Sequence, residues 1–235
     1  MFQHIRKMSV HSASLLLLLL LCADFAFIVL HIIDETLVLN SSLFNTAGSY
    51  GYLTIYQLVK LFWVVILLAY VLKSTRCSGY VSWILVFTYL LFDEALQIHQ
   101  NIGSHIANSF DTYLPHNLSL RPRHFELAVL VVAGTFLFAI VAWAYSRSPH
   151  AFRKISNDMF LFIVVWAFFG VFTDLAAAVK LGPLVEFASD FVEDGGEMAV
   201  VSLILWYVFL LAIRNGKPDL FLHDLLCKPL TRRST

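Results

Sequence analysis

Six long apolar segments constrain the fold of this chain more than any other feature of its sequence. A helix of about 20 apolar residues crosses the roughly 30 Å hydrocarbon layer of a bilayer. Because lipid offers no hydrogen-bond partners, a spanning segment folds as a helix that pairs its own backbone groups. We therefore expect one all-α domain over residues 1–235, an integral membrane bundle of six transmembrane helices. The expected spans are residues 14–33, 53–72, 80–99, 125–145, 159–179 and 192–213.

The composition agrees with this fold class and excludes several others. Hydrophobic residues make up 59% of the chain and charged residues 14%, whereas soluble domains average about 25% charged residues. So few charged side chains cannot cover a water-facing surface, which excludes a soluble enzyme, a nucleic-acid-binding protein and a secreted disulfide scaffold. The three cysteines, Cys22, Cys77 and Cys227, are too scattered for a disulfide framework or a CxxC metal site.

The first apolar segment begins like a signal peptide, because Arg6 and Lys7 precede a run of leucines. The apolar sequence then continues to Ile33, and no small-residue cleavage site follows. We therefore expect this segment to be a retained span.

Lys and Arg residues are distributed unevenly between the two sets of loops. Of the 16, 12 lie in the N-terminal segment, the second and fourth loops and the C-terminal tail. Because cytoplasmic loops carry an excess of these residues, we expect both termini in the cytoplasm, at a plasma or inner membrane. Asn40 and Asn117 would then form outward-facing glycosylation sequons if the source is eukaryotic. The expected partners are bilayer lipid and other membrane subunits, and not nucleic acid.

The acidic residues have the opposite distribution. Only Asp158, Asp219 and Asp224 fall on the cytoplasmic side, and the other 13 of 16 lie in the membrane or at its outer face. An ionisable group in a span costs several kcal/mol unless it faces a cavity or a partner, so it is a candidate for function. Because neighbouring spans run in opposite directions, the acids of the third to sixth spans share the outer half of the bundle. Between the third and fourth spans, residues 100–122 are expected to form a solvated connection, or alternatively to cap the bundle.

The sixth span and its approach carry the densest group of carboxylates. At helical spacing, five of them fall within an arc of about 100°, where they should repel one another. Either some of Glu193, Asp194 and Glu197 are functional, or Glu186 and Asp190 are simply solvated and only Glu197 lies deep in the membrane. Gly195 and Gly196 weaken this helix, and they either break the stripe of carboxylates or let another helix or a ligand approach. The five are Glu186, Asp190, Glu193, Asp194 and Glu197.

The third span ends in Asp93 and Glu94, followed by His99. On an unbroken helix, His99 would project roughly 120–140° away from either acid. Asp93 and His99 could therefore bind one ion only if the helix ended near Gln97, or if His99 contacted a neighbouring span. The alternative for His99 is an interfacial histidine with a satisfied hydrogen bond.

Together these side chains predict a cation- or metal-binding site in the outer half of the bundle. Carboxylates with imidazole suit Zn, Mn or Fe, and carboxylates with carbonyl oxygens and water suit Ca or Mg. The sequence does not distinguish among these divalent ions, and it contains no HExxH, ExxH or GxSxG motif. The candidate ligands are Asp93, Glu94, His99, Glu193, Asp194 and Glu197, followed in rank by Glu126, Asp174, His124, Glu186 and Asp190.

Asp24 lies in the middle of the first span, and Lys60 lies inside the second. Each needs a partner in lipid, so we expect the two to form an intramembrane pair. This pair is either a packing device, which we favour, or a relay in a proton or ion path.

Two short stretches resemble a pattern in uncharacterised bacterial polytopic membrane proteins. They are LFDEALQIH at residues 91–99 and EDGGEM at residues 193–198. In those proteins a helix ends in Asp-Glu, three residues and Ile-His-Glu, and the last span opens with an acidic pair and Glu-Met. This chain has Gln100 in place of the final Glu. The resemblance implies a site at these positions and carries no activity with it.

Three functions remain open at the level of sequence. The first is a membrane protein that binds a metal or another cation, as a binding protein or a metal-dependent enzyme that activates water. The second is an accessory or assembly subunit of a larger membrane complex, whose acids pair with a partner. The third is a proton- or cation-coupled transporter that uses the same acids with Asp24 and Lys60.

Overall fold

The computed structural model describes residues 2–36, 51–111, 122–178 and 183–216. Over these residues the chain forms seven α-helices and no strand, which confirms the expected all-α class. The helices are α1 (Phe2–Thr36), α2 (Tyr52–Thr75), α3 (Tyr80–Leu96), α4 (Ile98–Asp111), α5 (Pro122–Arg147), α6 (His150–Ala178) and α7 (Pro183–Ile213).

Several of these helices are compatible with membrane spans. α1, α2, α5 and α7 are each long and apolar enough to cross a bilayer, and α3 with α4 would make a fifth, broken span. α6 covers residues 159–178 of the fifth expected span (residues 159–179), but its side chains are described only as far as Gly170. The helical content therefore agrees with a membrane protein, while the count of six spans and the cytoplasmic termini stay predictions.

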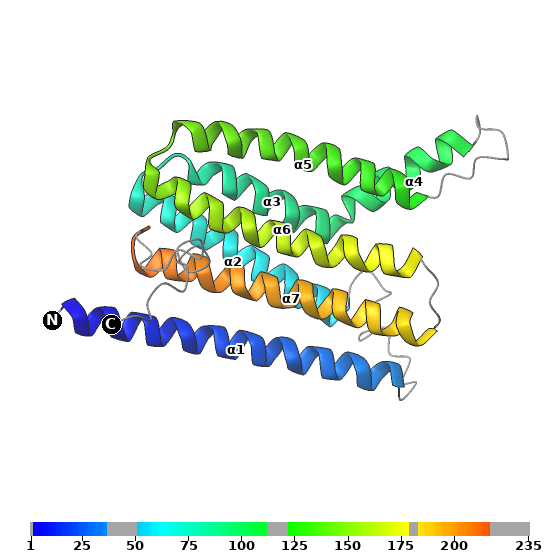
Figure 1. Cartoon of the computed structure of the whole chain (residues 1–235), viewed down its shortest axis with the longest axis horizontal. Helices are drawn as coiled ribbons and strands as arrows, with labels where there is room; N and C mark the ends of the chain where they lie inside the picture. The colour runs from blue at the N-terminus through cyan, green and yellow to red at the C-terminus, as the bar shows by residue number, and fades with distance from the viewer. Residues whose placement is uncertain (1, 37–50, 112–121, 179–182, 217–235) are drawn as a thin grey trace, which may run out of the picture.

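The long helices lie side by side as an elongated bundle in which successive helices run in opposite directions (Figure 1). α7 lies against α1, α2 and α6 and is the most buried of the helices that could span a membrane. Val201, Ile204, Val208 and Leu211 of α7 are fully buried at spacings of three and four residues, as expected for the core-facing stripe of a helix. α1 and α5 instead lie at the periphery of the bundle.

The segment after the third span differs from the expected solvated connection. Ile98–Asp111 forms the separate helix α4, which packs closely against α5. Gly103 and Ala107 are buried, one turn apart, while Asn101 and His105 are exposed. The segment is therefore an amphipathic helix, whose few small and apolar residues at helical spacing suffice to dock it on α5.

Gly195 and Gly196 lie within an unbroken α7, so they do not interrupt the helix that carries the carboxylates. The alternative, close approach of other helices, is confirmed. A Cβ on Gly196 would collide with the ring of Phe169 on α6, and one on Gly195 would lie 3.2 Å from Ile28 Cδ1 on α1. The glycine pair thus lets α7 pack tightly between α1 and α6.

Candidate functional site

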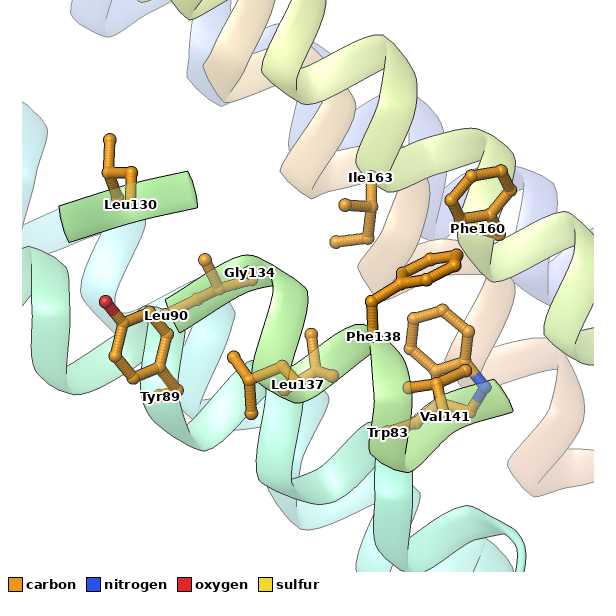
Figure 2. A pocket seen from close by; sticks show the side chains of 11 residues that line it. Trp83, Tyr89, Leu90, Leu130, Gly134, Leu137, Phe138, Val141, Phe160 and Ile163 are labelled. Atoms are coloured by element: carbon orange, nitrogen blue, oxygen red, sulfur yellow. The ribbon is translucent and has the colours of Figure 1, made fainter. Parts of the chain in front are cut away.

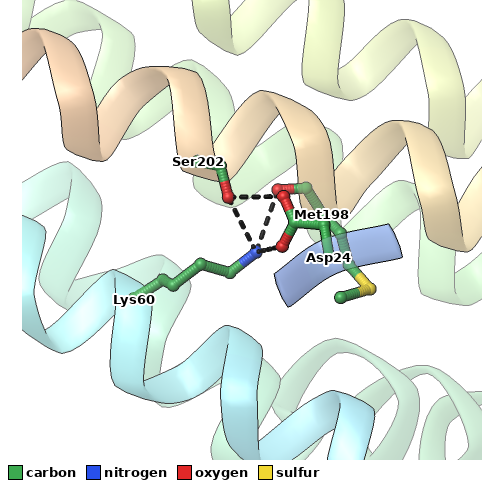
Figure 3. A network of polar contacts seen from close by, with 4 residues as sticks. All are labelled: Asp24, Lys60, Met198 and Ser202. Atoms are coloured by element: carbon green, nitrogen blue, oxygen red, sulfur yellow. Dashed lines mark hydrogen bonds and ion pairs between the residues drawn. The ribbon is translucent and has the colours of Figure 1, made fainter. Parts of the chain in front are cut away.

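One cluster of polar side chains lies in the interior of the bundle and joins α1, α2 and α7 (Figure 3). Lys60 Nζ donates hydrogen bonds to Asp24 Oδ1 at 2.8 Å, to the Met198 carbonyl oxygen at 2.9 Å and to Ser202 Oγ at 3.2 Å. Ser202 Oγ in turn donates to Asp24 Oδ2 at 2.6 Å. The structure thus brings together Asp24 and Lys60, the pair expected from the sequence, and adds two groups from α7.

All three N–H donors of the Lys60 ammonium group are used within this cluster. An ammonium group has three N–H donors, and Lys60 has three acceptors. The Lys60 side chain is 0% exposed, and Nζ also lies 4.5 Å from the centroid of the Tyr56 ring. The pair is neutral overall and leaves no lysine donor for a ligand.

A different polar cluster lies at the end of the bundle where α3 gives way to α4. Gln97 adopts the left-handed backbone conformation (φ 50°, ψ 45°), and the helix axis bends there by 61°. His99 therefore belongs to α4 rather than to the end of α3. Its backbone N–H donates to Asp93 Oδ1 at 3.0 Å, and its Nδ1 lies 2.7 Å from Asp93 Oδ2. The helix break thus brings together two side chains that an unbroken helix would separate.

Asp93 has two effects on this turn. It accepts a backbone N–H from the first turn of α4, where such groups lack partners within the helix. Its Oδ2 also faces the His99 ring, and in a neutral imidazole that donates from Nδ1 to this carboxylate, Nε2 is the nitrogen with a lone pair for a ligand. Because the His99 side chain is 21% exposed and that of Asp93 only 8%, the imidazole is the more accessible partner.

Further carboxylates surround this turn. Glu94 and Glu126 both act electrostatically on His99, and Asp194 of α7 acts on Glu94. Ser104 Oγ of α4 donates a long hydrogen bond of 3.4 Å to Glu126 Oε1. The structure therefore places candidates from α3, α4, α5 and α7 around the same end of the bundle.

The remaining candidates are less closely connected to His99. Glu197 faces α6, where its Oε1 would lie 3.1 Å from a Cβ on Gly170. His124 is exposed in the first turns of α5. No three His, Cys, Asp or Glu side chains form a metal-binding group within the described part of the chain. The side chains of Asp174, Glu186, Asp190 and Glu193 lie outside the described residues.

Sequence reasoning missed a buried acid at the opposite end of the bundle. Asp158 of α6, assigned only to the cytoplasmic side, is 1% exposed and accepts a 2.6 Å hydrogen bond from the Tyr207 hydroxyl of α7. The neighbouring Ile155 and Met159 mark a buried face at helical spacing, which could have indicated that Asp158 lies at its edge. Nothing in the sequence identifies Tyr207 as its partner.

With this geometry in place, the chain can be compared with known proteins. A family model described as a domain of unknown function, DUF8692, matches residues 13–213. The chain belongs to this family. No curated protein and no solved structure matches it.

Proposed function

We propose that this DUF8692 member is a six-span membrane protein that binds a divalent metal ion at the acidic end of its bundle, with His99 Nε2 as one ligand. The observation that carries the proposal is the 2.7 Å contact between Asp93 Oδ2 and His99 Nδ1. Metal-bound histidines commonly donate their other ring N–H to a carboxylate, which fixes the orientation of the ring and makes it a better ligand. In this proposal Asp93 orients the imidazole and does not itself bind the ion.

Carboxylates would complete the ligand set. Glu94 and Glu126 are the first candidates, because both already act electrostatically on His99. The sequence assigns only Arg121, Arg123 and Lys180 to this side of the membrane, so a divalent cation would offset a large excess of negative charge. A ligand set of imidazole and carboxylate suits Zn, Mn or Fe better than Ca or Mg.

The distribution of basic residues supports an orientation with both termini in the cytoplasm. α1 begins and α7 ends at the end of the bundle opposite the acidic one (Figure 1). Cytoplasmic ends of spans are enriched in Lys and Arg. The end of the bundle where α1 begins and α7 ends carries five basic residues on its helix termini and connections: Lys73, Arg76, Arg147, Arg153 and Arg214. The metal site would then face the outside of the membrane.

Metal content by mass spectrometry tests this proposal on protein purified in mild detergent without a chelator or a polyhistidine tag. We expect about one ion per chain in the wild type, as for a single built site, and its loss in His99→Gln. His105→Gln is the matched control, because His105 is exposed on the same helix and should leave the metal content unchanged.

Absence of metal in the wild type, even after incubation with Zn, Mn or Fe salts, would refute the proposal and favour an accessory subunit that pairs its acids with a partner. Equal loss in His99→Gln and His105→Gln would also refute it, since surface histidines would then be the ligands. A transporter that uses Asp24 and Lys60 is less favoured, because the three donors of Lys60 are already bound.

A further inference from the structure

A cavity of about 130 Å³ lies between α3, α5 and α6 (Figure 2). Its walls include Trp83 and Leu90 from α3, Gly134 and Phe138 from α5, and Phe160 and Ile163 from α6. The cavity is partly open, and α5 touches α3 and α6 at few positions. This side of the bundle is therefore packed less tightly than the side formed by α1, α2 and α7.

The surface of the cavity is almost entirely carbon. The Trp83 ring nitrogen already donates to Ser156 Oγ at 3.1 Å. The Tyr89 hydroxyl is the other polar group of the lining side chains, and it is buried near the carboxylate of Asp93, one turn along α3. A bound water needs two to four polar partners, roughly, and apolar cavities stay dry or take up apolar molecules. The natural occupant is therefore a hydrocarbon.

The position of the cavity indicates where such a hydrocarbon would come from. α5 is long and apolar enough to cross a membrane, and its outer face exposes Val131, Val132 and Phe136. A bilayer would bring lipid chains against this face and against the opening beside it. Gly134 lines the cavity and leaves open space beside it, because no atom lies within 4 Å of where its Cβ would be.

We propose that this cavity binds one hydrocarbon chain of a membrane lipid, which enters sideways from the bilayer past α5. An apolar cavity of about 150 Å³ is enough to bind benzene, so the volume here accommodates a short stretch of a single chain. The Tyr89 hydroxyl lies toward Leu130, and Asp93 follows Tyr89 one helical turn later (Figure 2). The polar end of the lipid would thus point toward the acidic end of the bundle. The proposal stands whether or not that end binds a metal.

Photolabelling in liposomes tests this site with the full chain. The probe is a phosphatidylcholine that carries a diazirine in one acyl chain, and labelled peptides are identified by mass spectrometry. We expect labels on the partly buried cavity residues Leu90, Leu137 and Ile163 to exceed those on the exposed outer face of α5. Gly134→Leu fills the cavity and should lower the cavity labelling about tenfold, as a steric penalty of about 1.4 kcal/mol would.

Val132→Leu is the matched control, because it adds a methylene group on the same helix at a position that is 71% exposed. It should leave cavity labelling unchanged. Labelling spread evenly over α5, or cavity labelling that Gly134→Leu leaves intact, would overturn the proposal. A retained circular-dichroism spectrum in Gly134→Leu would show that any loss of labelling reflects the filled cavity rather than misfolding.

Discussion

Two carboxylates in this protein each contact a nitrogen base, and the two pairs differ in what they leave free. Asp24 meets Lys60 inside the bundle, where Met198 and Ser202 take the remaining lysine donors. Asp93 meets His99 at the end of the bundle, where one ring nitrogen remains without an assigned role. The first pair joins the unbroken helices α1, α2 and α7, whereas the second lies at the bend between α3 and α4.

The difference separates structure from function in physical terms. A buried pair whose groups are all satisfied holds its helices together, and removing either partner leaves a costly buried charge. In the Asp93–His99 pair, one imidazole nitrogen contacts the carboxylate and orients the ring, and the other nitrogen can bind a ligand. We therefore expect substitutions in the first pair to change stability, and those in the second to change binding.

Removal of the lysine from the interior pair should have the largest effect. Lys60→Met leaves the Asp24 carboxylate buried without its cation, with only hydroxyl groups such as that of Ser202 beside it. Loss of one partner from a buried ion pair costs about 3–5 kcal/mol. The free energy of unfolding, measured by denaturant titration in mixed micelles, should fall by this amount, while metal content per folded chain stays unchanged.

The double variant Asp24→Leu/Lys60→Met is the control for this prediction. Apolar replacement of both partners of a buried pair is often neutral or stabilising, so the double variant should unfold close to the wild type. If the single variant were no less stable than the double, the pair would not hold the helices together, and the comparison above would fail.

The sequence is sufficient to predict the pairing of Asp24 with Lys60, but not the two groups of α7 that also bind the lysine. Two ionisable residues in apolar segments each need a partner, and few are available in lipid. Ser202 looks like any small polar residue in an apolar helix, and the Met198 carbonyl carries no side-chain signal at all. Which helices lie next to each other is fixed by packing, which an apolar pattern does not encode.

The acidic end was harder to predict because its geometry depends on one backbone angle. Gln97 is a non-glycine residue at φ 50°, and neither Gly nor Pro marks the break. The left-handed conformation is uncommon for such a residue, so nothing local separates α3 from α4 in the sequence. Without the break, Asp93 and His99 would lie on different faces.

The second largest effect is expected from a substitution that disturbs the close packing of α4 on α5. A Cβ on Gly103 would lie 2.6 Å from the Glu126 backbone nitrogen, which cannot move aside like a side-chain tip. Gly103→Ala should therefore lower the free energy of unfolding by about 1–3 kcal/mol, as overpacking does, and it should weaken metal binding near Glu126. Gly134→Ala is the matched control, because open space surrounds that position. Equal stability of the two variants would show that α4 docks loosely.

Removal of the orienting charge should act on binding alone. Asp93→Asn keeps an oxygen that can accept the His99 backbone N–H, but its amide no longer favours a proton on Nδ1. Loss of such an orienting partner weakens metal affinity by about 10–100-fold, measured by competition with a chromophoric chelator. The free energy of unfolding should change little. Unchanged affinity would mean that Asp93 serves only as the cap of α4.

The smallest expected effect concerns the third member of the interior cluster. Ser202→Ala removes one hydrogen bond to Asp24 and one acceptor of Lys60, while the 2.8 Å ion pair and the Met198 contact remain. Interhelical hydrogen bonds of membrane proteins average about 0.6 kcal/mol, so the free energy of unfolding should fall by roughly 1 kcal/mol. Ser82→Ala is a suitable control, because that hydroxyl bonds to the Gly79 carbonyl three residues earlier in the chain and joins no helices. A cost near that of Lys60→Met would show that the serine, rather than the ion pair, holds α7 to α1.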